Sequence, residues 1–281
     1  MNRNPFLLRL LSPGCVIALA LAAALVAILQ YSFRTYVPGS LEVGGFTLEN
    51  FARLSNPSYA WVFVDTLWTG VLTAAVTLLL GYPLAYAMVR KGGSTTKAVM
   101  LVLAITPLFT GDIVRTYAWL TMLGNSGFVN SMLMGIGLID QPLQLMYTKF
   151  GVLLALVQYS MPIMVIILAA AISHIDRNYE KAATSLGANP LRVFCGVTLP
   201  LSMPGIVSGC LTIFAWTLSA FATPQLIGGG NVMMVSNLVY QIGFSAFNFP
   251  FAAVLCLAAL VLSLTLMLTM RRVSGGAGGM H

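Results

Sequence analysis

Charged side chains are rare in this chain, so their positions indicate where it can do chemistry. Only 7% of its 281 residues are charged and 58% are hydrophobic. Asp112 and Arg115 stand three residues apart inside an apolar stretch, where a charge is costly and is usually kept for function. On a helix this spacing puts both on one face. They can neutralise each other there, or they can serve as a gate or as part of a solute path.

Other polar and aromatic side chains in or beside the apolar stretches are further candidates for a solute path. They are Asp65, Tyr117, Trp119, Gln158, Tyr159, Trp216 and Ser219. Aromatic faces and a carboxylate together suit a cationic solute. Two of these residues also have interpretations that need no role in a solute path: Asp65 fits a position at the membrane interface, and Trp216 fits ordinary helix packing. Pro162 follows the polar step formed by Gln158 and Tyr159 and is expected to kink that helix.

Motifs for catalysis, nucleotide binding and metal binding are missing from the sequence. The glycines at 228–230 are followed by Asn231 and precede no Lys-Ser/Thr pair, which a phosphate-binding loop requires. No HExxH or GxSxG motif occurs, and the four cysteines form no CxxC pair. We therefore expect no catalytic residue, no metal site and no cofactor within this chain.

Six apolar stretches are long enough to cross a membrane, which takes about 20 residues. They are 13–33, 62–89, 98–123, 149–173, 201–222 and 251–270. The third is the weakest, because Asp112 and Arg115 interrupt it. The first could be mistaken for a signal peptide, but its length and the lack of a small-x-small cleavage site favour a retained helix. The sequence thus predicts an all-α membrane protein with six transmembrane helices.

The basic residues set the expected orientation. With the N-terminus inside, ten of the 14 lysines and arginines fall in inner segments, as the positive-inside rule requires. These ten are Arg3, Arg9, Arg90, Lys91, Lys97, Arg177, Lys181, Arg192, Arg271 and Arg272. Both termini are then cytoplasmic, and the net charge of +7 reports topology rather than nucleic-acid binding.

The segments between the apolar stretches suggest a simple organisation. We expect a first helix with an outer loop at 1–60, a core at 61–272 and a flexible tail at 273–281. Turns are expected at 34–60 and short helices at 124–148. The uncharged segment 223–250 is expected to fold back against the helices, because irregular backbone near lipid must be shielded by protein.

The polar segment 174–200, expected on the inner side, predicts two short helices joined by a glycine turn. Asp176 or Asn178 can cap the first helix, and Gly187 stands where it should end. Pro190 is suited to the first turn of the second helix, and Pro200 is expected to end it.

An apolar edge on the second helix indicates how this segment could be used. Leu191, Phe194 and Val197 recur at spacings of three, and the small Ala182 and Ala183 allow close packing. Such a surface can enter a groove on another protein. The alternative is an amphipathic loop lying on the membrane surface.

The spacing Ala182-Ala183-x3-Gly187-x9-hydrophobic-x-Leu-Pro200 resembles the loop of binding-protein-dependent ABC importer permeases. The stretches 107–130 and 221–229 are similar to the polyamine-type branch of that family. The resemblance covers roughly residues 60–272. It implies a type I ABC importer permease fold, in which the 174–200 loop couples the permease to an ATPase subunit. The loop residues implicated are Glu180, Lys181, Ala182, Ala183, Gly187, Pro190, Leu191, Phe194, Val197 and Pro200.

The resemblance also implies a function and partners. The chain would form half of the path for a small cationic solute such as a polyamine, or else for an amino-acid-derived or opine-like solute. Its partners would be a second permease, two ATPase subunits that bind ATP and Mg, and an outer solute-binding protein, in a bacterial inner membrane. A secondary transporter is the remoter alternative, because such a protein typically shows internal repeats and ion-coupling carboxylates at the midplane.

The loop departs from the family pattern at one position. Family members commonly read Glu-Ala-Ala, whereas this chain has Lys181 before the alanines and its glutamate one place earlier, at Glu180. One residue turns a side chain by about 100° around a helix. Glu180 therefore either replaces the family's glutamate or leaves that contact absent.

Overall fold

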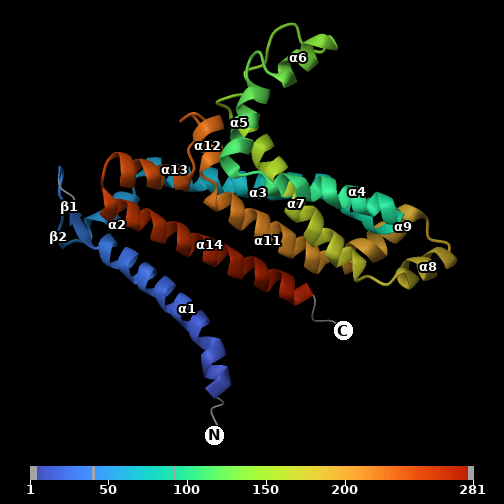
Figure 1. The fold of residues 1–281 in the computed structure, drawn as a ribbon, viewed down its shortest axis with the longest axis horizontal. Coiled ribbons are helices and arrows are strands. Elements are labelled where there is room, and N and C mark those ends of the chain that lie inside the picture. The colour runs from blue at the N-terminus through green and yellow to red at the C-terminus, as the bar shows by residue number, and fades with distance from the viewer. Residues whose placement is uncertain (1–4, 40–41, 92, 278–281) are drawn as a thin grey trace. The chain divides into compact units, whose positions relative to one another are not determined.

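The computed structural model describes residues 5–39, 42–91 and 93–277. Arg3, named above for topology, lies outside these ranges. The chain forms two compact units, of which the first comprises 1–63 and 238–262 and the second comprises 64–237 and 263–281. Most of the described structure is helical (Figure 1), as expected of an all-α protein.

The first unit contains the only strands among the described residues. Its elements are α1 (Pro5–Ser32), β1 (Arg34–Tyr36), β2 (Val43–Phe46), α2 (Glu49–Leu54), the π-helix η4 (Gln241–Ser245) and the first part of α14 (Phe249–Ala277). The two strands pair in antiparallel fashion. The Asn50 side-chain amide donates to the carbonyls of Ser32 and Arg34 at 3.2 and 2.8 Å, which holds α2 to the hairpin. Pro38 and Gly39 form a turn, as expected of 34–60, whereas the strand pair and α2 were not expected there.

The remaining helices lie wholly or partly in the second unit, since α3 begins and α13 ends within the residues of the first. From α3 to α7 they are α3 (Pro57–Tyr86), the π-helix η1 (Ala87–Lys91), α4 (Ser94–Ile105), the 3-10 helix η2 (Thr106–Phe109), α5 (Asp112–Leu123), α6 (Phe128–Gly135) and α7 (Lys149–Ser173). After α7 come α8 (Arg177–Ser185), α9 (Pro190–Val193), the π-helix η3 (Phe194–Thr198), α10 (Leu199–Leu201), α11 (Met203–Ser219), α12 (Ala222–Ile227) and α13 (Val235–Tyr240).

Four of the six expected membrane spans are confirmed as continuous apolar helices. Among the described residues these are Pro13–Ser32, Pro57–Arg90, Lys149–Ser173 and Phe249–Thr269. The other two are bent pairs: Lys97–Phe109 meets Asp112–Gly135 at 101°, and Pro190–Leu201 meets Met203–Ser219 at 64°. Figure 1 shows α5 turning sharply away from α4 at the first of these breaks. Length and composition thus allow up to six spans, two of them broken.

Three boundaries differ from the sequence-based expectation. Pro200 lies inside α10, and the bend follows at Ser202. Pro162 lies within α7, which continues through it as one helix. Helix α14 reaches Ala277, so residues 273–277 are helical rather than a flexible tail, and 278–281 lie outside the described residues.

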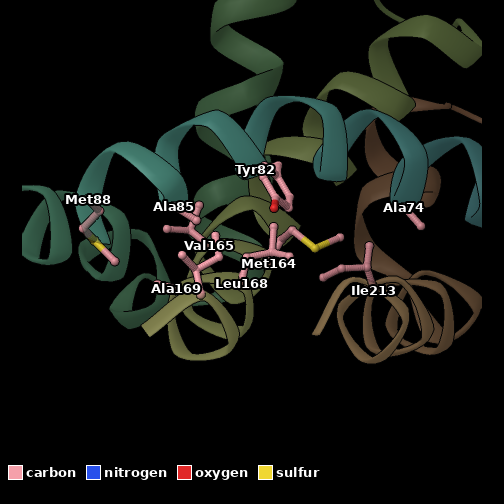
Figure 2. Close-up of a cluster of buried hydrophobic side chains, with 10 residues drawn as sticks. Ala74, Tyr82, Ala85, Met88, Met164, Val165, Leu168, Ala169 and Ile213 are labelled. Atoms are coloured by element: carbon pink, nitrogen blue, oxygen red, sulfur yellow. The ribbon is translucent and has the colours of Figure 1, made fainter. Parts of the chain in front are cut away.

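The core of the second unit lies where α3 and η1 pack on α7 and α11. Figure 2 shows Tyr82 and Ala85 of α3 facing Met164, Val165 and other side chains of α7. Helix α11 packs along α7 (Figure 1). Lipid supplies no hydrophobic driving force between helices, so such contacts depend on close packing of small residues.

A second buried cluster confirms that the uncharged segment after α11 folds back. Ile227 and Met234 of that segment are 0% and 1% exposed and pack with Leu123 of α5 and Val152 of α7. The side-chain amide of Asn237 donates to the Phe221 carbonyl at 3.2 Å. Protein therefore shields this irregular backbone, as the membrane requires.

Gly205 of α11 offers a test of the α7–α11 packing. A Cβ at this position would collide with the Cβ of Ala171, whereas a Cβ at Gly135 of α6 would meet nothing within 4 Å. Overpacking costs about 1–3 kcal/mol, while removing a helical glycine otherwise gains about 0.5–1 kcal/mol. We expect Gly205→Ala to lower the unfolding midpoint of the full chain in detergent and Gly135→Ala to leave it unchanged or higher. Equal midpoints would contradict this packing.

Candidate solute cavity and docking loop

A cavity of about 590 Å³ opens where α5, α7, α11 and the start of α12 meet. This volume is within the range of small-molecule sites. Six of the nine residues proposed for a solute path line it. They are Asp112, Arg115, Trp119, Tyr159, Trp216 and Ser219. The fold thus brings together residues that are up to 107 positions apart in the sequence (112 to 219).

Arg115 forms the cationic part of the cavity wall and holds the break before α5. Its side chain is 10% exposed and donates from Nη2 to the carbonyls of Pro107 and Thr110 at 2.7 and 2.5 Å. Its guanidinium carbon lies 4.5 Å from the centre of the Tyr159 ring. Both carbonyls belong to the broken turn. The Pro107 carbonyl also accepts from the Thr110 amide at 3.3 Å, so Arg115 adds a side-chain donor to the turn at both positions.

Asp112 is the acidic group of the cavity. Its Oδ1 lies 3.7 Å from Arg115 Nη1 and its side chain is 66% exposed. The pair expected from the spacing is present, but the shorter contacts of Arg115 are with carbonyls. The Asp112 carboxylate therefore remains open to the cavity.

Aromatic side chains line much of the rest of the cavity. The Trp119 indole nitrogen donates to Gln158 Oε1 at 3.2 Å, which fixes the ring in place from behind. The Tyr159 and Trp216 rings meet edge to face at 5.1 Å. The Ser219 hydroxyl donates to the Trp216 carbonyl at 2.8 Å and so is committed to its own helix.

Three proposed path residues do not line this cavity. Gln158 reaches it only through Trp119. Tyr117 is 56% exposed on another face of α5. Asp65 Oδ2 forms an ion pair with Lys149 Nζ at 2.8 Å, an interaction that the wide sequence separation concealed. Asp65 thus has a local cationic partner.

The cavity also includes residues that sequence reasoning did not single out. Thr116, Phe221 and Thr223 line it together with the backbone around Gly111. Phe221 and Thr223 fall in the 221–229 stretch that carried part of the family resemblance. That resemblance was the one signal in the sequence that pointed to them.

The 174–200 loop has the caps expected of it. Asp176 Oδ1 accepts from the Asn178 amide at 2.9 Å and begins α8. Gly187 has φ +86°. The amide of Gly187 donates to the Thr184 carbonyl and the amide of Ala188 to the Ala183 carbonyl, which is a Schellman motif. Asn189 then caps α9, with Pro190 in its first turn.

The expected apolar edge of Leu191, Phe194 and Val197 is wrong. A π-helix begins at Phe194 and turns its ring inward, where it meets the Tyr82 and Tyr86 rings edge-on at 5.5 and 5.6 Å. Val197 is half-buried and Leu191 is 72% exposed. The described apolar residues that the loop exposes most are Tyr179, Leu186 and Leu191, at 61%, 89% and 72%.

The two charged residues before the alanines point in different directions. Glu180 Oε1 accepts from Arg90 Nε at 3.0 Å and from the Thr198 hydroxyl at 2.9 Å. Lys181 and Ala182 are exposed, and Ala183 is half-buried. The glutamate therefore contacts its own chain, and the lysine faces outward.

Comparison with known proteins supports the family resemblance read from the sequence. Residues 78–274 match the family described as "Binding-protein-dependent transport system inner membrane component". The Haemophilus influenzae protein named spermidine/putrescine transport system permease protein PotB is 32% identical over 235 residues, which are 84% of this chain and 82% of that protein.

Solved structures resemble the fold. A chain in a crystal structure of a bacterial ABC transporter that imports the acidic polysaccharide alginate has a TM-score of 0.78 and 20% identity, covering 97% of this chain and 96% of that one. A chain of the alginate transporter in complex with an alginate-bound periplasmic protein gives the same score and identity, over 97% and 94%. At this identity the likeness establishes the fold alone.

The left-handed turn at Gly187 generates a prediction about the loop. Any side chain at φ +86° is strained by about 1–2 kcal/mol, whereas Gly196 lies in open space. Hydrogen exchange of the Ala188 amide in the full chain is the measurement. We expect Gly187→Ala to speed this exchange by roughly fivefold to thirtyfold and Gly196→Ala to leave it unchanged. Unaltered exchange in Gly187→Ala would show that the turn tolerates a side chain.

Proposed function

Because this chain belongs to the family of binding-protein-dependent inner membrane transport components, and so is a permease subunit of an ABC importer, we propose that its solute is a small polyamine-type cation. The observation that carries the proposal is the 32% identity to the PotB permease of Haemophilus influenzae over most of both chains. The relatives are transport subunits rather than enzymes, and the chain is a multi-pass membrane protein of that kind.

The cavity supports a cationic solute. The Asp112 carboxylate is its exposed ionic group, whereas Arg115 is buried and donates from Nη2 to two carbonyls. The indoles of Trp119 and Trp216 add aromatic surface to the wall, which attracts ammonium groups. A flexible chain of methylenes ending in ammonium groups matches both features.

The assembly is that of an ABC importer, and its finer details belong to the proposal. The cavity would be this chain's half of the path, and a second permease would complete it. Two ATPase subunits would bind ATP and Mg and dock on the 174–200 loop through Tyr179, Leu186 and Leu191. An outer binding protein would deliver the solute. The loop and both termini would lie on the cytoplasmic side of a bacterial inner membrane, which the distribution of basic residues supports.

Arg115 favours one alternative solute class. A fixed guanidinium in the cavity wall could pair with a carboxylate, so an amino-acid-derived or opine-like solute would place its ammonium near Asp112 and its carboxylate near Arg115. The carbonyls that Arg115 already contacts argue for the plain cation. Competition against labelled spermidine by a carboxylate-bearing amine separates the two classes.

Uptake by the reconstituted importer tests the proposed function. The complete complex in vesicles loaded with ATP should accumulate labelled spermidine when the binding protein is present outside. Omitting ATP or the ATPase subunits should abolish uptake, because permease subunits of this family lack an ATPase site of their own. Uptake that persists without the ATPase and follows a proton or sodium gradient would refute an ATP-driven permease.

Asp112→Asn tests the cavity itself. A hydrogen bond to a charged group contributes about 1.5–3 kcal/mol, so KM for spermidine should rise roughly tenfold or more while the complex still assembles. Asp140→Asn is the control, since that exposed carboxylate does not line the cavity. Equal KM values for the two variants would remove Asp112 from the solute path.

A further inference from the structure

Arg90 occupies a buried position at the end of the helix that includes α3 and η1. Its side chain is only 7% exposed. Nε donates to Glu180 Oε1 at 3.0 Å and Nη2 donates to the Ile175 carbonyl at 2.9 Å. Both acceptors belong to the segment that enters and forms α8. A guanidinium with two fixed acceptors holds this segment in one orientation.

Glu180 joins a third element to the same point. Its Oε1 also accepts from the hydroxyl of Thr198, the last residue of η3, at 2.9 Å. The Glu180 side chain is 17% exposed. One carboxylate oxygen therefore connects η1, α8 and η3. A glutamate committed in this way is poorly placed to bind a partner protein.

Further contacts run from this point to the helix that lines the cavity. The hydroxyls of Tyr82 and Ser202 are 2.8 Å apart and buried, and Ser202 is the residue at the bend before α11. Phe194 of η3 packs edge-on against Tyr82 at 5.5 Å. At its other end α11 contributes Trp216 to the cavity.

A second hydrogen bond fixes α8 to η1 independently. Arg177 Nη2, in the first turn of α8, donates to the Val89 carbonyl at 2.9 Å. The two anchors lie at positions 177 and 180 of one short helix, which puts them on the same side of it. Lys181 points elsewhere and is exposed. Helix α8 thus has one side tied to its own chain and another open.

We propose that Glu180 and Arg90 are positioning residues that transmit movement of the ATPase-docked loop to α3 and, through Thr198 and η3, to α11. This inference rests on the proposed function, because it assumes that an ATPase subunit moves the loop. It assigns Glu180 to an internal joint instead of the ATPase interface. By joint we mean the contacts of Glu180 with Arg90 and Thr198. Coupling between distant sites requires a physically connected element that both sites bias, and this joint supplies one.

The test compares Glu180→Gln with Lys181→Gln in the complete importer in vesicles. Glu180→Gln leaves the Arg90 charge buried without its counter-ion. ATPase subunits should still co-purify, while the ATP hydrolysed per solute imported rises by roughly tenfold. For the exposed Lys181→Gln the ratio should stay within about twofold of the parent. The exchanged pair Arg90→Glu with Glu180→Arg should recover part of the coupling, as interacting charges do.

Two results would overturn the proposal. One is an unchanged ATP-to-solute ratio in Glu180→Gln. The other is loss of the ATPase subunits from Glu180→Gln but not from Arg90→Gln, which would make Glu180 a docking contact. If Glu180→Gln fails to accumulate in the membrane, Thr198→Val, which keeps both charges, decides the matter. The ATP hydrolysed per solute imported by Thr198→Val should rise by about twofold to fivefold. An unchanged value would count against the joint.

A readout without transport separates this inference from the proposed function. In the isolated full chain, Glu180→Gln should speed hydrogen exchange of α8 amides by about tenfold, whereas Lys181→Gln should not. If the parent importer moves no polyamine but this difference is found, the solute assignment fails and the joint stands. If the parent transports spermidine and the exchange is unchanged, the joint fails alone.

Discussion

Two breaks in apolar helices, and the side chains that hold the backbone there, are the constraint on which the rest of this structure depends. A membrane offers no water to backbone groups at a bend, so side-chain donors beside each break add to the few backbone hydrogen bonds that remain. At the first break Arg115 reaches back to Pro107 and Thr110. At the second, the Ser202 hydroxyl donates to the Leu199 carbonyl at 2.9 Å and lies beside the Tyr82 hydroxyl. The cavity opens at the first break, and the docking loop leads into the second.

These two breaks also explain why a chain with so few charges keeps several of them buried. Arg115 is at once a backbone support and a wall of the cavity, and the Asp112 carboxylate beside it is exposed. Arg90 and Glu180 neutralise each other where the loop meets η1. In both places a buried charge organises irregular backbone next to an exposed charge, Asp112 or Lys181.

Much of this could be predicted from the sequence, because the relevant signals are local. Apolar length identified four continuous spans, and Asp176, Gly187 and Pro190 marked the loop helices through capping rules. The failures required tertiary information. Spacing alone could not foresee that η3 turns Phe194 onto Tyr82 and Tyr86. Spacing alone also could not reveal the ion pairs of Asp65 with Lys149 and of Glu180 with Arg90. The partners in each pair are more than 80 positions apart, so no periodic pattern in the sequence connects them.

We propose that the break before α5 builds a cation site and that the 174–200 loop drives it through the contacts of Glu180 and Arg90. A structure of the assembled importer holding spermidine would test this most directly. We expect an ammonium group within hydrogen-bonding distance of the Asp112 carboxylate, methylenes against Trp119 and Trp216, and Glu180 still bound to Arg90 with the ATPase docked. Solute bound elsewhere with this cavity empty, or Glu180 turned outward onto the ATPase, would contradict it.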